Sequence, residues 1–193
     1  MLNYNWKKEL LTIPNLLSLF RLFLIPVYVR MYLSAGSDLD YYLAGTVLGI
    51  SCLTDFADGK IARAYDMITN TGKILDPLAD KLTQLALILS LSGKHRILYP
   101  VLALFLIKEL FQCIALLTFM RKGKVLDGAL FSGKLSTAVL FTSLLVLVMF
   151  PRLPSRMVNI LVISDAVLLL IAFGSYAHAY FGSGTKLTDL RKE

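Results

Sequence analysis

Charged residues are scarce in this 193-residue chain. Asp, Glu, Lys and Arg make up 17% of it, 56% is hydrophobic, and the mean hydropathy is +0.68. Soluble domains usually carry about 25% charged residues, so the composition excludes that class and favours a membrane protein. Cysteine is also rare: Cys52 and Cys113 both lie in apolar runs and form no CxxC pair. Neither a disulfide framework nor a zinc site is therefore predicted.

Long apolar runs dominate the chain. A membrane-spanning helix needs about 20 mostly apolar residues, and six such runs are expected, at 13–33, 41–57, 75–92, 97–120, 134–151 and 157–181. We therefore predict an all-α integral membrane protein with six transmembrane helices in a single domain, residues 1–193. Residues 2–10 are interpreted as a short amphipathic segment, although a frayed tail explains them equally well. The first run is too long, and too polar at Asn15, Ser18 and Arg21, for a cleaved signal peptide.

Basic residues are distributed unevenly between the two sides of the predicted bundle. With the N-terminus inside, the cytoplasmic segments hold Lys7, Lys8, Lys60, Arg63, Lys73, Lys81, Arg121, Lys122, Lys124, Lys134, Lys186, Arg191 and Lys192. The opposite side holds Arg30, Lys94, Arg96, Arg152 and Arg156. This bias predicts a multi-pass protein of the cell membrane with residues 55–80 facing the cytoplasm. Because the basic residues flank spans, membrane lipids are their expected partners, and nucleic-acid binding is not predicted.

Four carboxylates at the end of the second run and the start of the third form the candidate active site. They are Asp55 and Asp58, three residues apart, and Asp76 and Asp80, four apart. On helices, each spacing puts the pair on one face. Two such faces brought together repel each other unless cations lie between them, and oxygen-only ligands suit hard divalent ions. No Ser, Cys or His lies between Asp58 and Asp80, so the segment has no obvious covalent nucleophile.

The same segment contains the order Asp-x2-Asp-Gly-x2-Ala-Arg-x8-Gly-x3-Asp-x3-Asp, formed by Asp55, Asp58, Gly59, Ala62, Arg63, Gly72, Asp76 and Asp80. It resembles the signature of the CDP-alcohol phosphatidyltransferases. The resemblance implies transfer of a phosphatidyl group from CDP-diacylglycerol to an alcohol, with release of CMP, in a homodimer. It implies two divalent cations, Mg²⁺ or Mn²⁺, held by the four aspartates, with Asp80 also the catalytic base. The implied cytidine diphosphate pocket comprises Asp58, Gly59, Ala62, Arg63 and Gly72.

Other segments bear on the acceptor alcohol. The string Ile13-Pro14-Asn15-Leu-Leu-Ser-Leu-Phe-Arg21 and the Gly-Lys-x-x-Thr at 133–137 resemble the bacterial phosphatidylglycerophosphate synthases. This implies glycerol 3-phosphate as acceptor; the alternative is phosphatidylglycerol, as in the cardiolipin synthases that share the fold. Arg21, Lys108, Arg121 and Lys134 are the expected acceptor-binding residues. For the basic loop, contact with anionic lipid is an equally good explanation.

Ionisable residues inside the later runs have less specific interpretations. Lys108 and Glu109 are adjacent, and adjacent helical residues do not face each other, so we do not expect them to form a self-contained ion pair. At least one should point toward a substrate or another helix. Asp165 is predicted to make a structural polar contact. A small ion or phosphate transporter is the competing class, but its polar residues are expected near the midplane rather than at one membrane face.

Overall fold

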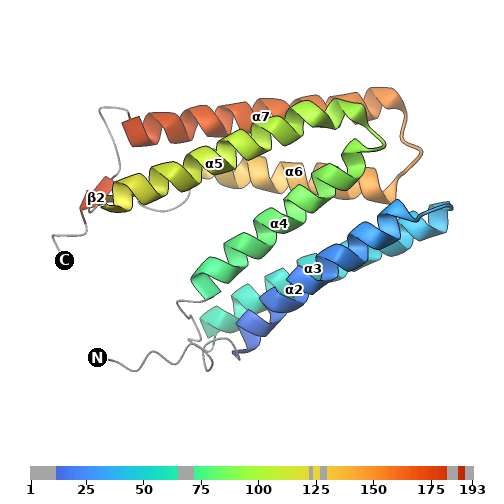
Figure 1. Cartoon of the computed structure of the whole chain (residues 1–193), viewed down its shortest axis with the longest axis horizontal. Coiled ribbons are helices and arrows are strands. Elements are labelled where there is room, and N and C mark those ends of the chain that lie inside the picture. The colour runs from blue at the N-terminus through green and yellow to red at the C-terminus, as the bar shows by residue number, and fades with distance from the viewer. Residues whose placement is uncertain (1–11, 65–71, 122–123, 127–129, 182–186, 190–193) are drawn as a thin grey trace. The chain divides into compact units, whose positions relative to one another are not determined.

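The computed structural model describes residues 12–64, 72–121, 124–126, 130–181 and 187–189, without the side chains of 56–64, 73–74, 124–126 and 187–189. Within these residues the long elements are α2 (Ile13–Leu33), α3 (Asp38–Ala64), α4 (Gly72–Ser92), α5 (Tyr99–Arg121), α6 (Phe131–Met149) and α7 (Ser155–Phe181) (Figure 1). The predicted helical class is thus confirmed. The described residues also form a 3-10 helix, η1 (Arg96–Leu98). They form two short strands as well, β1 (Lys124–Leu126) and β2 (Leu187–Asp189), which were not predicted.

Four helices in the described part of the chain are long and apolar enough to cross a membrane. They are Ile13–Leu33, Leu98–Arg121, Phe131–Met149 and Ser155–Phe181. Helices α3 and α4 have 27 and 21 residues, but each carries motif carboxylates near one end. All six long helices expose large apolar side chains, for example Phe23, Leu53, Leu89, Leu110, Phe131 and Ile163. Such surfaces suit lipid rather than water, which indicates a multi-pass membrane protein.

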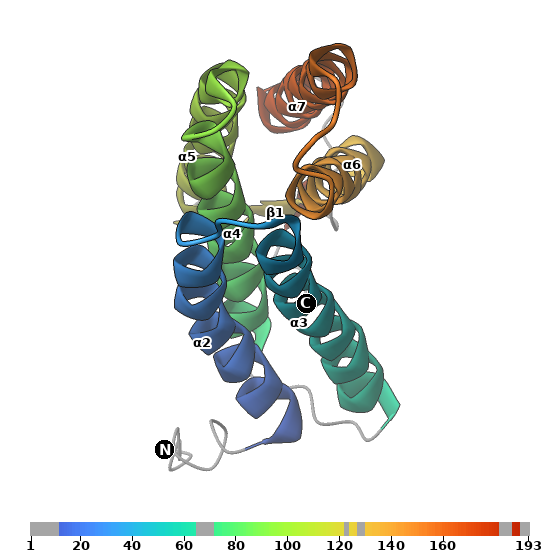
Figure 2. The same cartoon turned by 90° about the vertical axis from the view of Figure 1, so that its right-hand side faces the viewer.

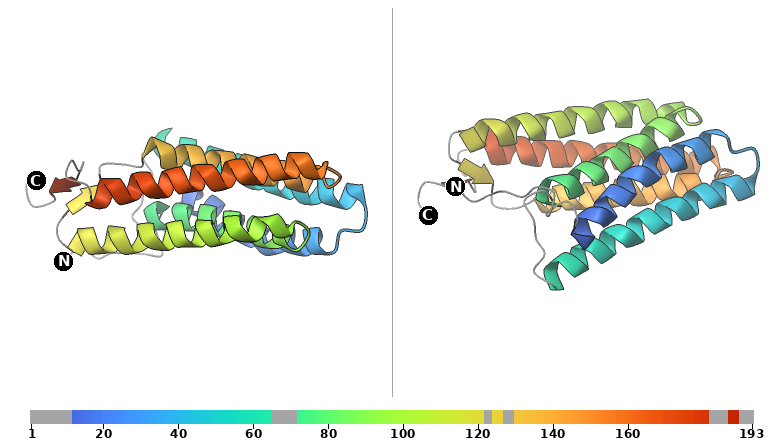
Figure 3. Two further views of the ribbon diagram at one scale, coloured as in Figure 1. Left: turned by 90° about the horizontal axis from the view of Figure 1, so that it is seen from above. Right: turned by 60° about the horizontal axis from the view of Figure 1, so that its bottom comes forward.

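The chain divides into two compact units, Met1–Gly93 with Leu145–Arg152, and Lys94–Leu144 with Leu153–Glu193. In the first unit, α2 packs along both α3 and α4, as Figure 2 and Figure 3 show. Tyr28 of α2 and Ser90 of α4 are joined by a hydrogen bond of 3.0 Å between their hydroxyl oxygens. Gly45 of α3 meets Met149: a Cβ at this position would lie 2.9 Å from Met149 Cγ. Only glycine therefore permits this close approach without a shift of the methionine.

In the second unit, aromatic rings join α5 to α7. Phe111 and Phe173 have ring centroids 5.0 Å apart, and Phe119 and Tyr180 have theirs 5.1 Å apart. Helices α6 and α7 are joined by a hydrogen bond of 3.0 Å from Ser143 Oγ to Asp165 Oδ1. Both of these side chains are buried, which confirms the predicted structural contact of Asp165.

The first residues of α3 and α4 differ from the sequence expectation. Helix α3 begins at Asp38 rather than 41, because Ser37 and Asp40 form a reciprocal capping arrangement. Ser37 N and Gly36 N donate to Asp40 Oδ2 over 2.8 and 3.0 Å. Helix α4 begins at Gly72, so Pro77 lies inside it rather than in its first turn. Proline there removes only one hydrogen bond near the helix start.

Candidate active site

A polar stripe on α2 forms one wall of the candidate site. Asn15, Ser18 and Arg21 recur at intervals of three on one face of the helix. Their side chains are buried, with 1%, 0% and 3% of their surface exposed. Arg21 therefore faces the protein interior. A buried guanidinium requires an anionic or hydrogen-bonding partner.

The partners of this stripe are two motif aspartates on different helices. Arg21 Nη1 donates to Asp55 Oδ1 on α3, and the two residues form an ion pair. Ser18 Oγ donates to Asp76 Oδ1 on α4. Arg21 Nη2 also donates to Ser18 Oγ over 3.4 Å. One short stretch of α2 therefore links carboxylates from the two halves of the motif, which are 21 residues apart in sequence (55 to 76).

Asp80 lies one turn beyond Asp76 on α4 and is partly exposed. Asp55 keeps 52% of its side chain exposed, so the carboxylates remain accessible to a water-soluble ligand.

The donor chemistry of this cluster suits hard divalent cations, because carboxylate oxygens are the ligands that Mg²⁺ and Mn²⁺ prefer. Among the described residues, no group of three or more His, Cys, Asp or Glu side chains is arranged to hold a metal ion. The predicted ligand Asp58 lies outside the described side chains, as do Gly59, Ala62 and Arg63 of the expected nucleotide pocket. Gly72 is described as a buried residue at the start of α4.

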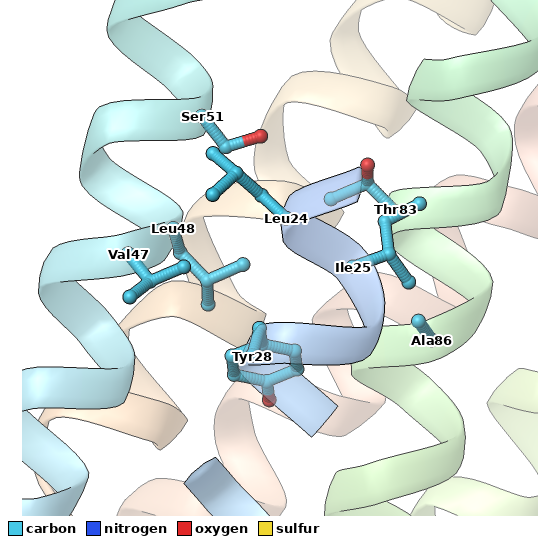
Figure 4. Close-up of a pocket in the computed structure, with 8 residues that line it drawn as sticks. All are labelled: Leu24, Ile25, Tyr28, Val47, Leu48, Ser51, Thr83 and Ala86. Carbon is cyan, nitrogen blue, oxygen red and sulfur yellow. The ribbon is translucent and has the colours of Figure 1, made fainter. Parts of the chain in front are cut away.

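Just beyond the carboxylates, α2, α3 and α4 enclose a narrow, mainly apolar crevice (Figure 4). Its walls are Leu24, Ile25, Tyr28, Val47, Leu48, Ser51, Thr83 and Ala86. Thr83 Oγ1 donates to Ala79 O of its own helix over 2.8 Å. The hydroxyl of Thr83 is therefore already hydrogen-bonded within α4.

The other expected acceptor-binding residues belong to the second unit. Lys108 is 3% exposed, so the expectation that at least one of the two residues points inward is confirmed. Lys108 Nζ lies 2.7 Å from Glu109 Oε1, so the expectation that the two would not form an ion pair with each other was wrong. The reason is the length of the lysine side chain, which reaches around the helix although the two Cβ atoms diverge. Arg121 ends α5 and Lys134 lies in the first turn of α6; both are exposed.

Two contacts, one in each unit, were missed from the sequence. The Ser18 hydroxyl binds Asp76, although Ser18 stands out in the sequence only as a polar residue of the first apolar run. Tyr176 of α7 lies against Gly133 of α6, where an added Cβ would be 2.5 Å from Tyr176 Oη. The three-residue spacing of Ser18 and Arg21 was a usable signal for the first contact. No local pattern indicates the second.

Comparisons with known proteins agree with this arrangement. A family model described as "CDP-alcohol phosphatidyltransferase" matches residues 11–175. The "Probable phosphatidylglycerophosphate synthase" of Mycobacterium tuberculosis is 28% identical over 87% of this chain and 80% of its own. The "CDP-diacylglycerol--glycerol-3-phosphate 3-phosphatidyltransferase" of Rickettsia bellii is 30% identical, covering 83% of this chain and 87% of its own.

A relative whose name gives a different lipid product is also similar. The "Cardiolipin synthase (CMP-forming)" of Streptomyces coelicolor is 31% identical over 67% of this chain and 61% of its own. The family match includes α2, α3 and α4, on which the aspartates and their partners Ser18 and Arg21 lie. The chain, with its carboxylates gathered by a buried arginine and serine, belongs to the CDP-alcohol phosphatidyltransferase family of enzymes.

Proposed function

We propose that this protein transfers the phosphatidyl group of CDP-diacylglycerol to glycerol 3-phosphate, releasing CMP and forming phosphatidylglycerophosphate. The observation that carries the proposal is the pair of contacts from α2 to Asp55 and Asp76. They join the two halves of the aspartate motif at one end of α2, α3 and α4. A lipid-linked donor needs its headgroup at such an end, because its acyl chains stay in the bilayer.

The proposed site residues are those of the motif. Asp55, Asp58, Asp76 and Asp80 would hold two divalent cations, Mg²⁺ or Mn²⁺. When bound, the cations would neutralise the donor pyrophosphate and the charge that develops on departing CMP. Gly59, Ala62, Arg63 and Gly72, together with Asp58, would form the cytidine diphosphate pocket. Arg63 suits it because its planar guanidinium matches phosphate oxygens.

Asp80 is the proposed base. It would accept the proton of the acceptor hydroxyl while the acceptor oxygen forms a bond to the phosphorus that carries diacylglycerol. The bond from that phosphorus to the CMP oxygen breaks, and CMP leaves. This is a single displacement that requires no covalent enzyme intermediate, in keeping with the lack of Ser, Cys and His between Asp58 and Asp80.

The acceptor assignment rests on the relatives and on charge. The match to the R. bellii relative, whose name includes glycerol 3-phosphate, covers 87% of that protein. The match to the cardiolipin synthase of S. coelicolor covers 61% of that protein. Exposed Arg121 and Lys134 are proposed to attract the acceptor phosphate. Lys108 is less suited to this role, because Glu109 already matches its charge. A cardiolipin synthase activity, with phosphatidylglycerol as acceptor, is the second candidate.

The membrane setting completes the proposal. We infer six transmembrane helices, with α3 and α4 also spanning, in the cell membrane with the site facing the cytoplasm, as the charge bias predicts. A single domain over residues 1–193 and a homodimer remain predictions from composition and family resemblance.

The experiment that tests the function supplies purified protein with CDP-diacylglycerol, Mg²⁺ and radiolabelled glycerol 3-phosphate, and identifies the lipid product. Parallel reactions contain phosphatidylglycerol instead, or EDTA. We expect labelled phosphatidylglycerophosphate and stoichiometric CMP, both lost with EDTA and restored by Mg²⁺ or Mn²⁺. Cardiolipin formed only with phosphatidylglycerol would transfer the assignment to the second candidate. No CMP release with either acceptor would reject both.

A further inference from the structure

Helix α2 supplies none of the motif aspartates, yet it contacts two of them. Arg21 binds Oδ1 of Asp55, and Ser18 binds Oδ1 of Asp76. In both contacts the carboxylate accepts through Oδ1 and not through Oδ2. The two α2 residues are themselves joined through Arg21 Nη2 and Ser18 Oγ, 3.4 Å apart.

We propose that Arg21 and Ser18 are positioning residues for the divalent-cation site, rather than ligands for the acceptor. They hold Oδ1 of Asp55 and Asp76 and leave Oδ2 of each to ligate a cation. The inference rests on the proposed function, because it requires that these aspartates bind metal. It changes the expected role of Arg21, which the sequence assigned to acceptor binding.

Burial and hydrogen-bond geometry carry this assignment. Arg21 is 3% exposed, whereas its partner Asp55 is 52% exposed. A phosphate arriving from water therefore reaches Asp55 more easily than it reaches the guanidinium. The planar fork of arginine can donate to two acceptors in fixed directions, which the ammonium of lysine does less well. Here Asp55 and Ser18 are two of its acceptors.

A positioning role and an electrostatic role of Arg21 predict opposite changes in metal affinity when Arg21 is replaced. Metal-ligating carboxylates are commonly held by hydrogen bonds from neighbouring groups, and loss of such a partner typically weakens metal affinity by about 10- to 100-fold. A purely electrostatic role for Arg21 would act in the opposite direction, because a positive charge beside the site repels a cation. Removal of the guanidinium therefore separates positioning from repulsion.

The test measures Mn²⁺ binding by calorimetry to the full-length protein in lipid nanodiscs, without nucleotide. The variants are Arg21→Met, Arg21→Lys and Ser18→Ala, with Asp55→Asn as a ligand-loss reference. Arg30→Met is the matched control, because Arg30 lies in the last turn of the same helix and is exposed. Since Asp55 is half-exposed, it can be solvated in the Arg21 variants, and we expect them to fold; thermal unfolding without Mn²⁺ checks this.

We expect Arg21→Met to weaken Mn²⁺ binding by about 10- to 100-fold, and Ser18→Ala and Arg21→Lys by less. Arg30→Met should bind as the wild type does. At saturating Mn²⁺, the KM for glycerol 3-phosphate should be unchanged in Arg21→Met. Equal or tighter Mn²⁺ binding by Arg21→Met would overturn the proposal, as would a KM raised more than tenfold at saturating Mn²⁺. If neither wild type nor Asp55→Asn bound Mn²⁺, the metal site of the proposed function would fail instead.

Discussion

The two compact units hold their helices together by different chemistry. In the first unit, the contacts between α2 and the motif aspartates are charged or polar, and they involve side chains such as Asp55 that remain open to solvent. In the second unit, rings join α5 to α7, and α6 meets α7 through the close approach of Tyr176 to Gly133 and through a buried hydrogen bond from Ser143 to Asp165. Polar contacts can be exchanged for a ligand, whereas tightly packed rings cannot. We therefore expect the reaction to take place in the first unit and the second unit to be the more rigid of the two.

The largest expected effect is the loss of a proposed metal ligand. Asp55→Asn and Asp76→Asn should each abolish phosphatidyl transfer, because the neutral amide oxygen of asparagine binds a divalent cation more weakly than a carboxylate does. CMP release from CDP-diacylglycerol at limiting Mg²⁺ measures this. Wild-type turnover in either variant would contradict the metal assignment. The Asp165→Asn variant is a control, because its carboxylate is buried against Ser143 in the second unit.

The second effect concerns Asp80, the proposed base. Asp80→Asn should lower kcat by about 10²- to 10⁴-fold, the usual contribution of general-base catalysis. Binding of a non-reacting CDP analogue, measured by calorimetry with metal present, should fall much less. An Asp80→Asn variant that loses analogue binding as severely as Asp55→Asn would show that Asp80 acts chiefly as a ligand.

A smaller effect is expected from Gly133→Ala in the second region. The added Cβ would lie 2.5 Å from Oη and 2.7 Å from Cε2 of Tyr176, a ring that is 7% exposed. Overpacking of this kind typically costs about 1–3 kcal/mol, so thermal unfolding in nanodiscs should occur at a lower temperature. The double variant Gly133→Ala with Tyr176→Leu should recover part of the loss. No recovery would mean that the tyrosine ring is not the obstacle.

The smallest effect is expected at the start of α3. Backbone N–H donation from Gly36, and hydrogen bonds from Ser37, hold the pKa of Asp40 below its ordinary value of 3.8. A carboxyl whose pKa is lower in the folded protein stabilises it above pH 3.8, and this stabilisation is lost as pH falls through the folded-state pKa. Asp40→Ala should therefore lower the melting temperature slightly at pH 7 and less at strongly acidic pH. If the difference in melting temperature between the wild type and Asp40→Ala did not change with pH, the ionised carboxylate of Asp40 would not be the stabilising group.

The sequence predicts the fold well because the fold is encoded locally. Apolar runs of membrane length predict the long helices, and the predicted bounds lie within about three residues of the observed ones except at the end of α3. This helix continues past the predicted residue 57 to Ala64, through polar residues that the apolar pattern leaves out. The earlier starts of α3 and α4 have local causes: Asp40 caps α3 earlier than expected, and α4 accommodates Pro77 in its interior. The short pairing of β1 with β2 was not predictable, since the two strands are separated by α6 and α7.

The candidate site was predictable in its residues but not in its contacts. Fixed spacing identifies Asp55, Asp76 and Asp80, whereas the partner of each depends on how the helices pack. The role of Arg21 shows this: its burial followed from its place in an apolar run, but its pairing with Asp55 required the arrangement of α2 and α3. For Lys108 the prediction itself was wrong. Adjacent residues on a helix point in different directions, which argued against an ion pair with Glu109, but the long lysine side chain can reach its neighbour.

The strand pairing has a consequence for the order in which the protein matures. Lys124 of β1 is paired with Asp189 of β2, and Leu126 with Leu187. The ribosome makes β1 before α6 and α7, but β2 only after them. The segment between α5 and α6 therefore stays without its strand partner until both later helices have been synthesised. Bringing together two strands that are so far apart in sequence is slow compared with forming a local turn. Pairing of β1 with β2 is therefore a late step in assembly, after the membrane helices are in place.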